Sequence, residues 1–252
     1  MSELASNDPV LLVGATSGLA RSIARGLAAE GRPLILAARD VQEAALIGAD
    51  LRVRYGIDIA VQAFDALEFN SHGHFFEACL EAASGNLGGM VVCHGDLADG
   101  IEAQEDFSVS RRLIDVNYTS FVSILNIAAE YFEHRRSGYL CVLSSVAGDR
   151  GRSSNYVYGS TKAAVSTYLQ GLRARMTRSG VQVITVKPGF IDTAMTWGLK
   201  APGPVGKAEI VGRDVCRAIA KRRNVVYTPW IYRWVMLIVR LIPEPIFKRL
   251  KL

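Results

Sequence analysis

Cysteine is scarce in this chain, and the cysteines that it has are far apart. The four residues are Cys79, Cys93, Cys141 and Cys216, and no two of them show Cys-x-x-Cys spacing. Cys93 and Cys141 lie within strand-like apolar runs, so we expect buried reduced thiols rather than disulfides or metal ligands. His72 and His74 have no convergent carboxylate or cysteine partners, so no metal site is predicted. This cysteine usage is typical of a reducing compartment such as the cytoplasm.

Long hydrophobic runs and clustered basic stretches are also missing. No run reaches the ~18 apolar residues of a membrane span, and the N-terminus has no basic region followed by an apolar stretch, so neither a span nor a signal peptide is expected. The net charge of +5 is scattered, with its sharpest excess at Lys248, Arg249 and Lys251. No arginine-rich run is interleaved with aromatic residues, so nucleic acid is not an expected partner. A mildly basic enzyme that binds anionic cofactors explains the charge as well.

What the chain does contain is a regular alternation of short apolar runs and longer helical patterns. The expected strands are residues 9–13, 33–37, 58–63, 89–93, 139–143, 181–186 and 224–227. The expected helices are residues 19–30, 41–55, 71–83, 107–136, 156–179 and 207–222. Apolar strands separated by helices predict a seven-stranded parallel sheet with helices on both faces. We therefore predict an α/β fold, a single doubly wound Rossmann-type domain over residues 1–252, with a Pro/Gly-rich loop (201–206) and an apolar segment in its substrate end, 200–252.

A glycine-rich turn follows the first expected strand and opens a helix. Its sequence is Gly14-Ala15-Thr16-Ser17-Gly18-Leu19-Ala20, in which the third glycine of the usual pattern is an alanine. Glycine lets the backbone turn tightly and lets a pyrophosphate approach the helix N-terminus, where free N–H groups favour an anion. The turn therefore predicts dinucleotide binding at Gly14, Thr16, Ser17, Gly18 and Leu19. The alternative is an ordinary strand-to-helix turn.

The end of the second expected strand bears on the choice between NADP(H) and NAD(H). An arginine here accepts a ribose 2′-phosphate, whereas a carboxylate holds a free 2′-hydroxyl. Arg39 therefore favours NADP(H), although Asp40 one position later weakens the argument. Asp65, after the third strand, is placed to accept a hydrogen bond from the adenine amino group. The alternatives are a solvated arginine at a helix start and a plain helix cap at Asp65.

Tyr158 and Lys162 are four residues apart and point the same way on the helix expected over 156–179. A free phenol loses its proton only near pH ~10 and is a poor acid–base catalyst at neutral pH. A nearby ammonium favours the phenolate, so we expect Lys162 to lower the pKa of Tyr158 until the phenol can exchange a proton with a substrate oxygen. Such pairs also arise by chance on solvated helix faces, so the hypothesis depends on the accompanying motifs.

Those motifs together resemble one family. Gly14-x-x-x-Gly18-x-Ala20, Asn117, Ser145, Tyr158-x-x-x-Lys162 and Pro188-Gly189 are similar in order and spacing to the short-chain dehydrogenase/reductase family, and the resemblance covers nearly the whole chain. It implies an NAD(P)H-dependent oxidoreductase that reduces a carbonyl to a secondary alcohol, with the hydride carried by the nicotinamide. It also implies a homodimer or homotetramer formed through the helices expected over 107–136 and 156–179.

The resemblance implies a role for each catalytic residue. Tyr158 is the acid–base residue, and Lys162 lowers its pKa and holds the nicotinamide ribose. Ser145 hydrogen-bonds the substrate oxygen, and Ser144 is its structural neighbour. Asn117 anchors a proton-relay water beside the lysine, although hydrogen bonding inside a helix also explains an asparagine there.

The resemblance also implies further cofactor contacts. They are Asp65 and Ala66 after the third strand, Gly95 after the fourth, and Pro188, Gly189, Ile191 and Thr193 around the nicotinamide carboxamide. Thr193 is also explained as a cap on the following helix. One departure is Cys93-His94-Gly95, where the family usually has Asn-Ala-Gly. Gly95 keeps the backbone freedom needed beside the cofactor, and we expect His94 to be a packed or capping histidine rather than a catalyst.

Residues 230–242 form a segment that is apolar nearly all round and is interrupted by Arg233 and Arg240, seven residues apart on one face. The segment is too short and too charged to span a bilayer. It could lie peripherally at a membrane surface with its arginines at the headgroups, or be buried against the substrate cleft or another subunit. Both alternatives favour a long apolar substrate or an apolar lid.

A narrower resemblance concerns the substrate. Phe64-Asp65-Ala66-Leu67, Asn117-Tyr118-Thr119, Tyr158-Gly159-Ser160-Thr161-Lys162 and the Tyr232-Arg233 … Ile242-Pro243 … Ile246-Phe247 end resemble reductases of a keto-sugar carried on a polyprenyl phosphate. This implies a lipid-like or lipid-linked carbonyl substrate, whose phosphate Arg150 and Arg152 could meet. The alternative for both is a solvated loop arginine.

The rival interpretation of the whole chain is a non-catalytic dinucleotide-binding protein or a membrane-surface scaffold, because a fold alone does not secure chemistry. Retention of Ser145, Tyr158 and Lys162 favours the enzyme.

Overall fold

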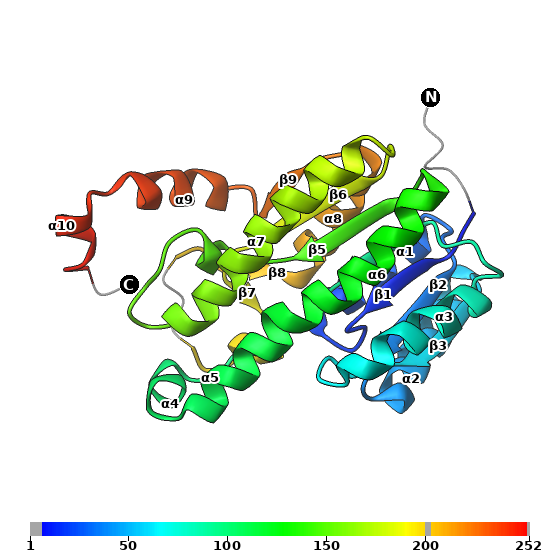
Figure 1. Ribbon diagram of the computed structural model, residues 1–252, viewed down its shortest axis with the longest axis horizontal. Helices are drawn as coiled ribbons and strands as arrows, with labels where there is room; N and C mark the ends of the chain where they lie inside the picture. Colours follow the sequence, from blue (N-terminus) through cyan, green and yellow to red (C-terminus); the bar gives the residue numbers. More distant parts are fainter. Residues whose placement is uncertain (1–6, 200–202, 251–252) are drawn as a thin grey trace.

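The structure, a computed structural model, describes residues 7–199 and 203–250, and a parallel seven-stranded sheet forms its centre (Figure 1). The strand order is β3-β2-β1-β4-β5-β6-β9. These strands are β1 (Val10–Val13), β2 (Leu34–Ala38), β3 (Ile59–Ala63), β4 (Gly89–Val92), β5 (Tyr139–Leu143), β6 (Gln182–Pro188) and β9 (Val225–Thr228). All seven correspond to strands expected from the sequence, so the prediction of a doubly wound α/β fold is confirmed.

Helices cover both faces of the sheet. One face packs against α1 (Gly18–Ala29), α2 (Val41–Tyr55) and α8 (Ala208–Ala220), and the other against α3 (His72–Ala82), α6 (Ser120–Arg135) and α7 (Tyr156–Thr177). Along β1, Val10 and Leu12 join the first cluster, whereas Leu11 and Val13 join the second, as the alternation of a strand requires. A strand buried on both faces needs apolar residues at every position, which is why the seven runs could be recognised.

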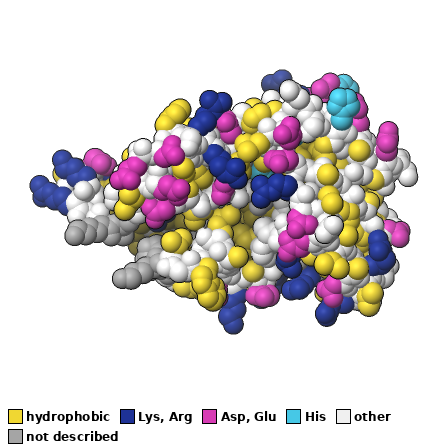
Figure 2. All heavy atoms as spheres, turned by 90° about the horizontal axis from the view of Figure 1, so that it is seen from below, with side chains coloured by type: hydrophobic (Ala, Val, Ile, Leu, Met, Phe, Trp, Pro, Cys, Tyr) yellow, Lys and Arg dark blue, Asp and Glu magenta, His cyan; other side chains and the backbone are white. Residues whose placement is uncertain are grey.

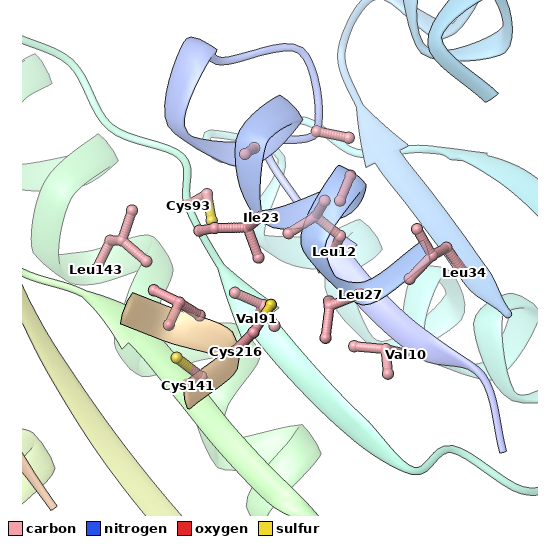
Figure 3. Close-up of a cluster of buried hydrophobic side chains, with 14 of the residues drawn as sticks. Val10, Leu12, Ile23, Leu27, Leu34, Val91, Cys93, Cys141, Leu143 and Cys216 are labelled. Carbon is pink, nitrogen blue, oxygen red and sulfur yellow. The ribbon is translucent and has the colours of Figure 1, made fainter. Parts of the chain in front are cut away.

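The cysteines belong to this core. Cys93, Cys141 and Cys216 lie among the buried side chains on the α1 and α8 side of the sheet (Figure 3). Cys79 lies in the opposite cluster. All four are free and buried, which confirms the expected buried thiols.

The helix expected over 107–136 is continuous but irregular. It consists of α5 (Phe107–Ile114), a π-helical turn, η3 (Asp115–Thr119), and α6. A π-helical turn adds a residue to the helical register and is frequent at functional sites. Here it carries Asn117, whose side chain it directs into the protein, fully buried.

Several short elements were not expected from the sequence. They are α4 (Gly100–Glu105), the paired strands β7 (Ile191–Asp192) and β8 (Gly206–Lys207), and the 3-10 turns η2 (Phe69–Ser71), η4 (Val146–Gly148) and η5 (Ala194–Thr196). Strand β8 begins at the end of the predicted Pro/Gly-rich loop; residues 201 and 202 of that loop lie outside the described residues. All of these elements lie beyond the carboxyl ends of the sheet strands or in loops, where no long periodic pattern exists to reveal them.

The C-terminal segment projects from the body as α9 (Tyr232–Leu241) and α10 (Glu244–Phe247), coloured red in Figure 1. Tyr232 and Met236 of α9 pack against Val146, which directly follows Ser145. The inner side of α9 therefore lies against the loop after β5. Over residues 7–199 and 203–250, no helix is long and apolar enough to cross a bilayer.

Candidate active site

The glycine turn between β1 and α1 has a backbone that only glycine adopts without strain. Gly14 has a φ of +80°, and a Cβ added there would lie 2.5 Å from the backbone nitrogen of His94. The Gly14 N–H donates to the Ala37 carbonyl at 2.8 Å, which ties the turn to β2. Ser17 caps α1 by accepting a hydrogen bond from the Ala20 N–H at 3.2 Å.

The N-terminus of α1 is open to solvent at Gly18. Gly18 is exposed, and a Cβ there would lie 3.5 Å from the methyl group of Thr193. Thr16 and Leu19 flank it half-buried. Two segments predicted to hold the cofactor, the first turn and the stretch after Pro188, thus face each other across the helix N-terminus. This arrangement fits a dinucleotide.

At the predicted adenosine end of the cofactor site, one polar side chain caps a helix and another is exposed to solvent. Asp40 is the N-cap of α2 and accepts from the Glu43 N–H at 2.9 Å. Arg39, at the end of β2, is exposed. Asp65 accepts from the Leu67 N–H at 2.9 Å, and Ala66 beside it is half-buried. The helix-cap alternative for Asp65 was wrong, because its bond to Leu67 closes a loop turn and the next helical turn, η2, has Glu68 as its N-cap. The carboxylate of Asp40, in contrast, is occupied by its helix.

Asn117 fastens the loop after β4. Its Oδ1 accepts from the Asp96 N–H at 3.0 Å, and its Nδ2 donates to the Asp96 carbonyl at 2.8 Å. A Cβ at Gly95 would lie 3.0 Å from Asn117 Oδ1 and 3.5 Å from Lys162 Nζ. Gly95 thus lets this loop approach the buried lysine, and three predicted site residues meet at one point.

The two serines after β5 face different ways. Ser144 is buried and donates to the Lys162 carbonyl at 2.9 Å, with Ser166 Oγ at 2.8 Å. This bond fastens β5 to α7. Ser145 is half-buried, accepts from the Ala147 N–H at 3.1 Å and is hydrogen-bonded to the Tyr158 phenol.

The Tyr158 phenol does not have the lowered pKa that its spacing from Lys162 suggests. Burial raises the pKa of Tyr158, while the hydrogen bond with Ser145 and the charge of Arg152 act in the opposite direction. The expectation was wrong in direction because desolvation of the phenolate outweighs the nearby charges. It was also wrong about the partner, because the cation acting on this phenol is Arg152. Tyr158 is consequently a protonated acid at neutral pH.

Lys162 is almost completely buried, one turn along α7 from Tyr158. Its Nζ lies 4.9 Å from the centre of the Phe121 ring and 5.7 Å from the centre of the Tyr158 ring. Burial lowers the pKa of Lys162 to about 8, because the ammonium is taken out of water. The lysine is therefore charged at neutral pH and loses its charge within the range where enzymes are assayed.

His94 is packed, as expected. Its Nε2 lies 2.7 Å from Ser120 Oγ, and its ring centre lies 4.4 Å from that of Phe121. Burial lowers the pKa of His94 to about 3, with the charge of Lys162 acting in the same direction. A neutral, enclosed imidazole of this kind stabilises the loop after β4. Within the described ranges, no group of three or more His, Cys, Asp and Glu residues is placed to hold a metal ion.

The segment after β6 is covered by α9. A Cβ at Gly189 would lie 2.1 Å from the Tyr232 ring, and Tyr232 Oη donates to the Pro204 carbonyl at 2.6 Å. Thr193 caps η5 in a reciprocal arrangement with Thr196, whose hydroxyl also donates to the Ile191 carbonyl at 2.6 Å. Capping and cofactor contact are compatible roles for Thr193. The sequence singled out Gly189 and Tyr232 separately, but their contact could not be predicted from it.

The loop between Ser145 and α7 holds two arginines with different surroundings. Arg150 donates to the carbonyls of Val239 at 2.7 Å and Ile242 at 2.5 Å. It also pairs with Glu244 at 2.9 Å and stacks 3.7 Å from the centre of the Phe247 ring. Both expectations for Arg150 were wrong: it is neither solvated nor free to meet a phosphate, because it fastens the C-terminal segment.

Arg152 places its charge near Tyr158. Its Nε is buried without a hydrogen-bond partner in the described part of the chain, and burial lowers the pKa of its guanidinium. It acts electrostatically on Tyr158 and Tyr232. A partly buried guanidinium whose Nε finds no hydrogen-bond partner among the described residues is suited to hold an anionic group.

A buried ion pair next to these arginines was missed. Asp149 pairs with Lys187 of β6 and accepts from Tyr227 Oη at 2.8 Å. Burial, followed by this hydrogen bond, raises the pKa of Tyr227 to about 12. The three residues are far apart in sequence and belong to no motif, so only the fold brings them together.

Comparison with known proteins decides the family. The family model described as short chain dehydrogenase matches residues 8–202. The chain belongs to the short-chain dehydrogenase family. It is 34% identical over 243 residues to an uncharacterized oxidoreductase of Mycobacterium tuberculosis, covering 96% of each chain. It is 30% identical over 252 residues to an uncharacterized oxidoreductase of Streptomyces coelicolor, covering 96% of this chain and 95% of the other.

Solved structures share the fold of this chain. A short-chain dehydrogenase from Sphingobium yanoikuyae in complex with NADPH has a TM-score of 0.80 and 25% identity, covering 91% of this chain and 92% of that one. A variant of actinorhodin polyketide ketoreductase with NADPH has a TM-score of 0.79 and 20% identity, covering 90% and 97%. The protein is therefore an oxidoreductase of the short-chain dehydrogenase type, an enzyme acting on CH–OH groups with NAD(P), and the non-catalytic alternative is not favoured.

Proposed function

We propose that this enzyme is an NADPH-dependent carbonyl reductase with Asn117, Ser145, Tyr158 and Lys162 as its catalytic set. The observation that carries the proposal is the placing of Tyr158 and Lys162 one turn apart on α7, with Lys162 Nζ 5.7 Å from the centre of the Tyr158 ring, while Ser145 acts on the pKa of the same phenol. When bound, the nicotinamide would supply the hydride to the carbonyl carbon. The proton has to come from the protein.

In this mechanism Tyr158 Oη donates its proton to the substrate oxygen, and Ser145 Oγ donates a hydrogen bond to that same oxygen. The charge of Arg152 stabilises the phenolate that remains on Tyr158, and the Lys162 ammonium would hold the nicotinamide ribose. Asn117 holds the loop that brings Gly95 against Lys162, so the ammonium keeps its place.

The test is Tyr158→Phe, with Tyr156→Phe as the matched control. Tyr156 lies on the same helix and is exposed. Tyr158→Phe should lower kcat for carbonyl reduction by about 10³-fold, because the general acid is lost. NADPH affinity, measured by fluorescence titration, should stay within about twofold, and Tyr156→Phe should leave both unchanged. Turnover that survives in Tyr158→Phe would show that the proton donor is another group.

For the cofactor, we propose NADP(H) in preference to NAD(H). The glycine turn Gly14 to Leu19 would hold the pyrophosphate and Arg39 the 2′-phosphate. Support comes from the exposed Arg39, the capping engagement of Asp40 and the NADPH in similar solved structures. Asp65 and Ala66 would lie at the adenine, and Gly95, Lys162, Pro188, Gly189, Ile191 and Thr193 around the nicotinamide ribose and ring. Titration with both dinucleotides tests the preference, and tighter NADH binding would refute it.

For the substrate, we propose a lipid-like or lipid-linked carbonyl compound that carries an anionic group. The end of the chain resembles decaprenylphosphoryl-2-ketoribose reductase, and Arg152 offers a partly buried guanidinium whose Nε has no hydrogen-bond partner in residues 7–199 and 203–250. In a screen of keto-lipids and keto-sugars with and without phosphate, Arg152→Met should raise KM about tenfold or more for the phosphate-bearing compounds alone. Equal effects on neutral substrates would contradict anion recognition by Arg152.

We also propose that residues 1–252 act as one cytoplasmic domain that assembles into a homodimer or homotetramer through α5, α6 and α7. Phe107 at the start of α5 is strongly exposed, which supports a contact there. Light scattering coupled to size-exclusion chromatography measures the assembly. A monomer at micromolar concentration would refute it.

A further inference from the structure

The outer side of the C-terminal segment is an apolar surface that the fold does not use. Its large side chains are Trp230, Trp234, Leu237, Ile238 and Leu241, between 45% and 72% exposed. At 100° per residue, these positions fall on one side of α9 and of the turn that leads into it. Together they form what we call the outer face of α9.

The inner side of α9 is already packed against the rest of the protein. Tyr232 and Met236 are buried against Val146, and Val235 and Val239 pack beside them. The outer face therefore contributes nothing to holding α9 in place. Exposed apolar side chains gathered in this way usually mark an interaction site.

The charges around the outer face decide which partner suits it. Arg233 and Arg240 are exposed and lie along one edge of the face. Residues 230–252 contain five basic residues and a single acidic one, Glu244, which is paired with Arg150. Figure 2 shows Lys and Arg side chains gathered at the tip of the molecule that α10 forms; Lys251 lies outside the described residues.

We propose that the outer face of α9 docks on an anionic lipid surface, with the helix lying in the plane of the headgroups. Tryptophan and aliphatic side chains would enter the interface, while the arginines at the edge meet lipid phosphates. A second copy of this chain suits the face less well. Two outer faces packed together would bring their basic edges along the same seam, where like charges repel.

Docking would also place the active site at the lipid surface. Tyr232 of α9 lies on Gly189 and is hydrogen-bonded to Pro204, so the docking helix is part of the wall beside the predicted nicotinamide site. Arg150 fastens the other end of α9 to the loop that follows Ser145. A substrate held in the lipid would then reach the predicted nicotinamide site by the shortest route.

Vesicle flotation tests the proposal, using the full chain with phosphatidylcholine vesicles that contain or lack phosphatidylglycerol. The key variant is Leu237→Glu/Ile238→Glu. The matched control is Leu46→Glu/Val53→Glu on α2, which adds the same charges at exposed apolar positions away from α9. The unmodified chain and the control should float with the anionic vesicles, with a blue shift of tryptophan emission. The key variant should bind at least ~10-fold more weakly.

Two further measurements separate the alternatives. Arg233→Gln/Arg240→Gln should lower binding to anionic vesicles about tenfold, with little effect on neutral ones. Thermal unfolding shows whether the key variant folds. If it does not fold, Trp234→Gln takes its place in the flotation assay. No flotation of the unmodified chain, equal flotation of key variant and control, or an α9 variant that only changes the oligomeric state would each overturn the proposal. The assay involves no turnover, so it does not depend on the proposed reaction.

Discussion

The two ends of this chain use their apolar residues in opposite ways. In the part matched by the family, residues 8–202, the apolar side chains of the sheet strands form two buried clusters with the helices on either face. In residues 230–250, one small cluster and one arginine hold α9, and its larger apolar side chains remain exposed. The first part contains the predicted site residues, and the second keeps a group of large apolar side chains on its surface.

The largest loss of stability is expected from Gly14→Ala, which tests how tightly residues 8–202 are packed. A left-handed φ costs a residue with a Cβ about 1–2 kcal/mol, and a clash with backbone adds to this, so we expect a loss of about 3 kcal/mol or more. Gly31 is the control, because its φ is +74° and a Cβ there would meet nothing within 4 Å. Thermal unfolding and NADPH titration should show Gly31→Ala losing only the backbone cost. Equal losses would mean that the turn is not tightly enclosed.

At the other end, Arg150→Met should release the C-terminal segment without unfolding the sheet. Removing the donor leaves the last carbonyls of α9 without their partner and also removes the stacking on Phe247, a local loss of about 2–3 kcal/mol. Hydrogen exchange should rise over residues 232–250 and remain unchanged in β1 to β6. Arg240→Met removes the same charge from an exposed position and should change neither. A rise spread over the whole sheet would show that the two ends are one cooperative unit.

The same contrast explains how much could be predicted from the sequence. Strands buried on both faces, the glycine turn and the Tyr158–Lys162 spacing each leave a local pattern, so the sheet and the site residues could be predicted by position. The raised pKa of Tyr158 could not, because it depends on how much water the fold removes and on Arg152 rather than on helix spacing. The anchoring by Arg150 could not either, because it joins positions about ninety residues apart.

A smaller effect concerns the adenosine end, where Arg39 and Asp40 gave conflicting indications. Arg39→Gln should reduce the preference for NADPH over NADH by about tenfold or more, because a charge-assisted contact with the 2′-phosphate is lost. Asp40→Asn should leave the preference unchanged, because that side chain caps α2. Dissociation constants for both dinucleotides measure the two variants. A change of preference in Asp40→Asn alone would assign the selectivity to the carboxylate.

The smallest effect, and the one that best separates burial from exposure, is the pH dependence set by Lys162. Burial lowers its pKa to about 8, so the ammonium is present below that pH and is lost as the pH rises through it. Tyr158 stays protonated over this range, because burial raises its pKa. We therefore expect kcat/KM for carbonyl reduction to be level below pH 8 and to fall by about tenfold per pH unit above it.

Two lysine variants serve as controls for this fall in kcat/KM, which we call the alkaline limb. Lys162→Arg keeps the charge and should remove the alkaline limb, even if the variant is slower at every pH. Lys248→Arg, a change at an exposed lysine of the C-terminal segment, should leave the limb in place. A limb that appears only near pH ~10, the range of an ordinary lysine, would show that Lys162 is hydrated in solution and not enclosed.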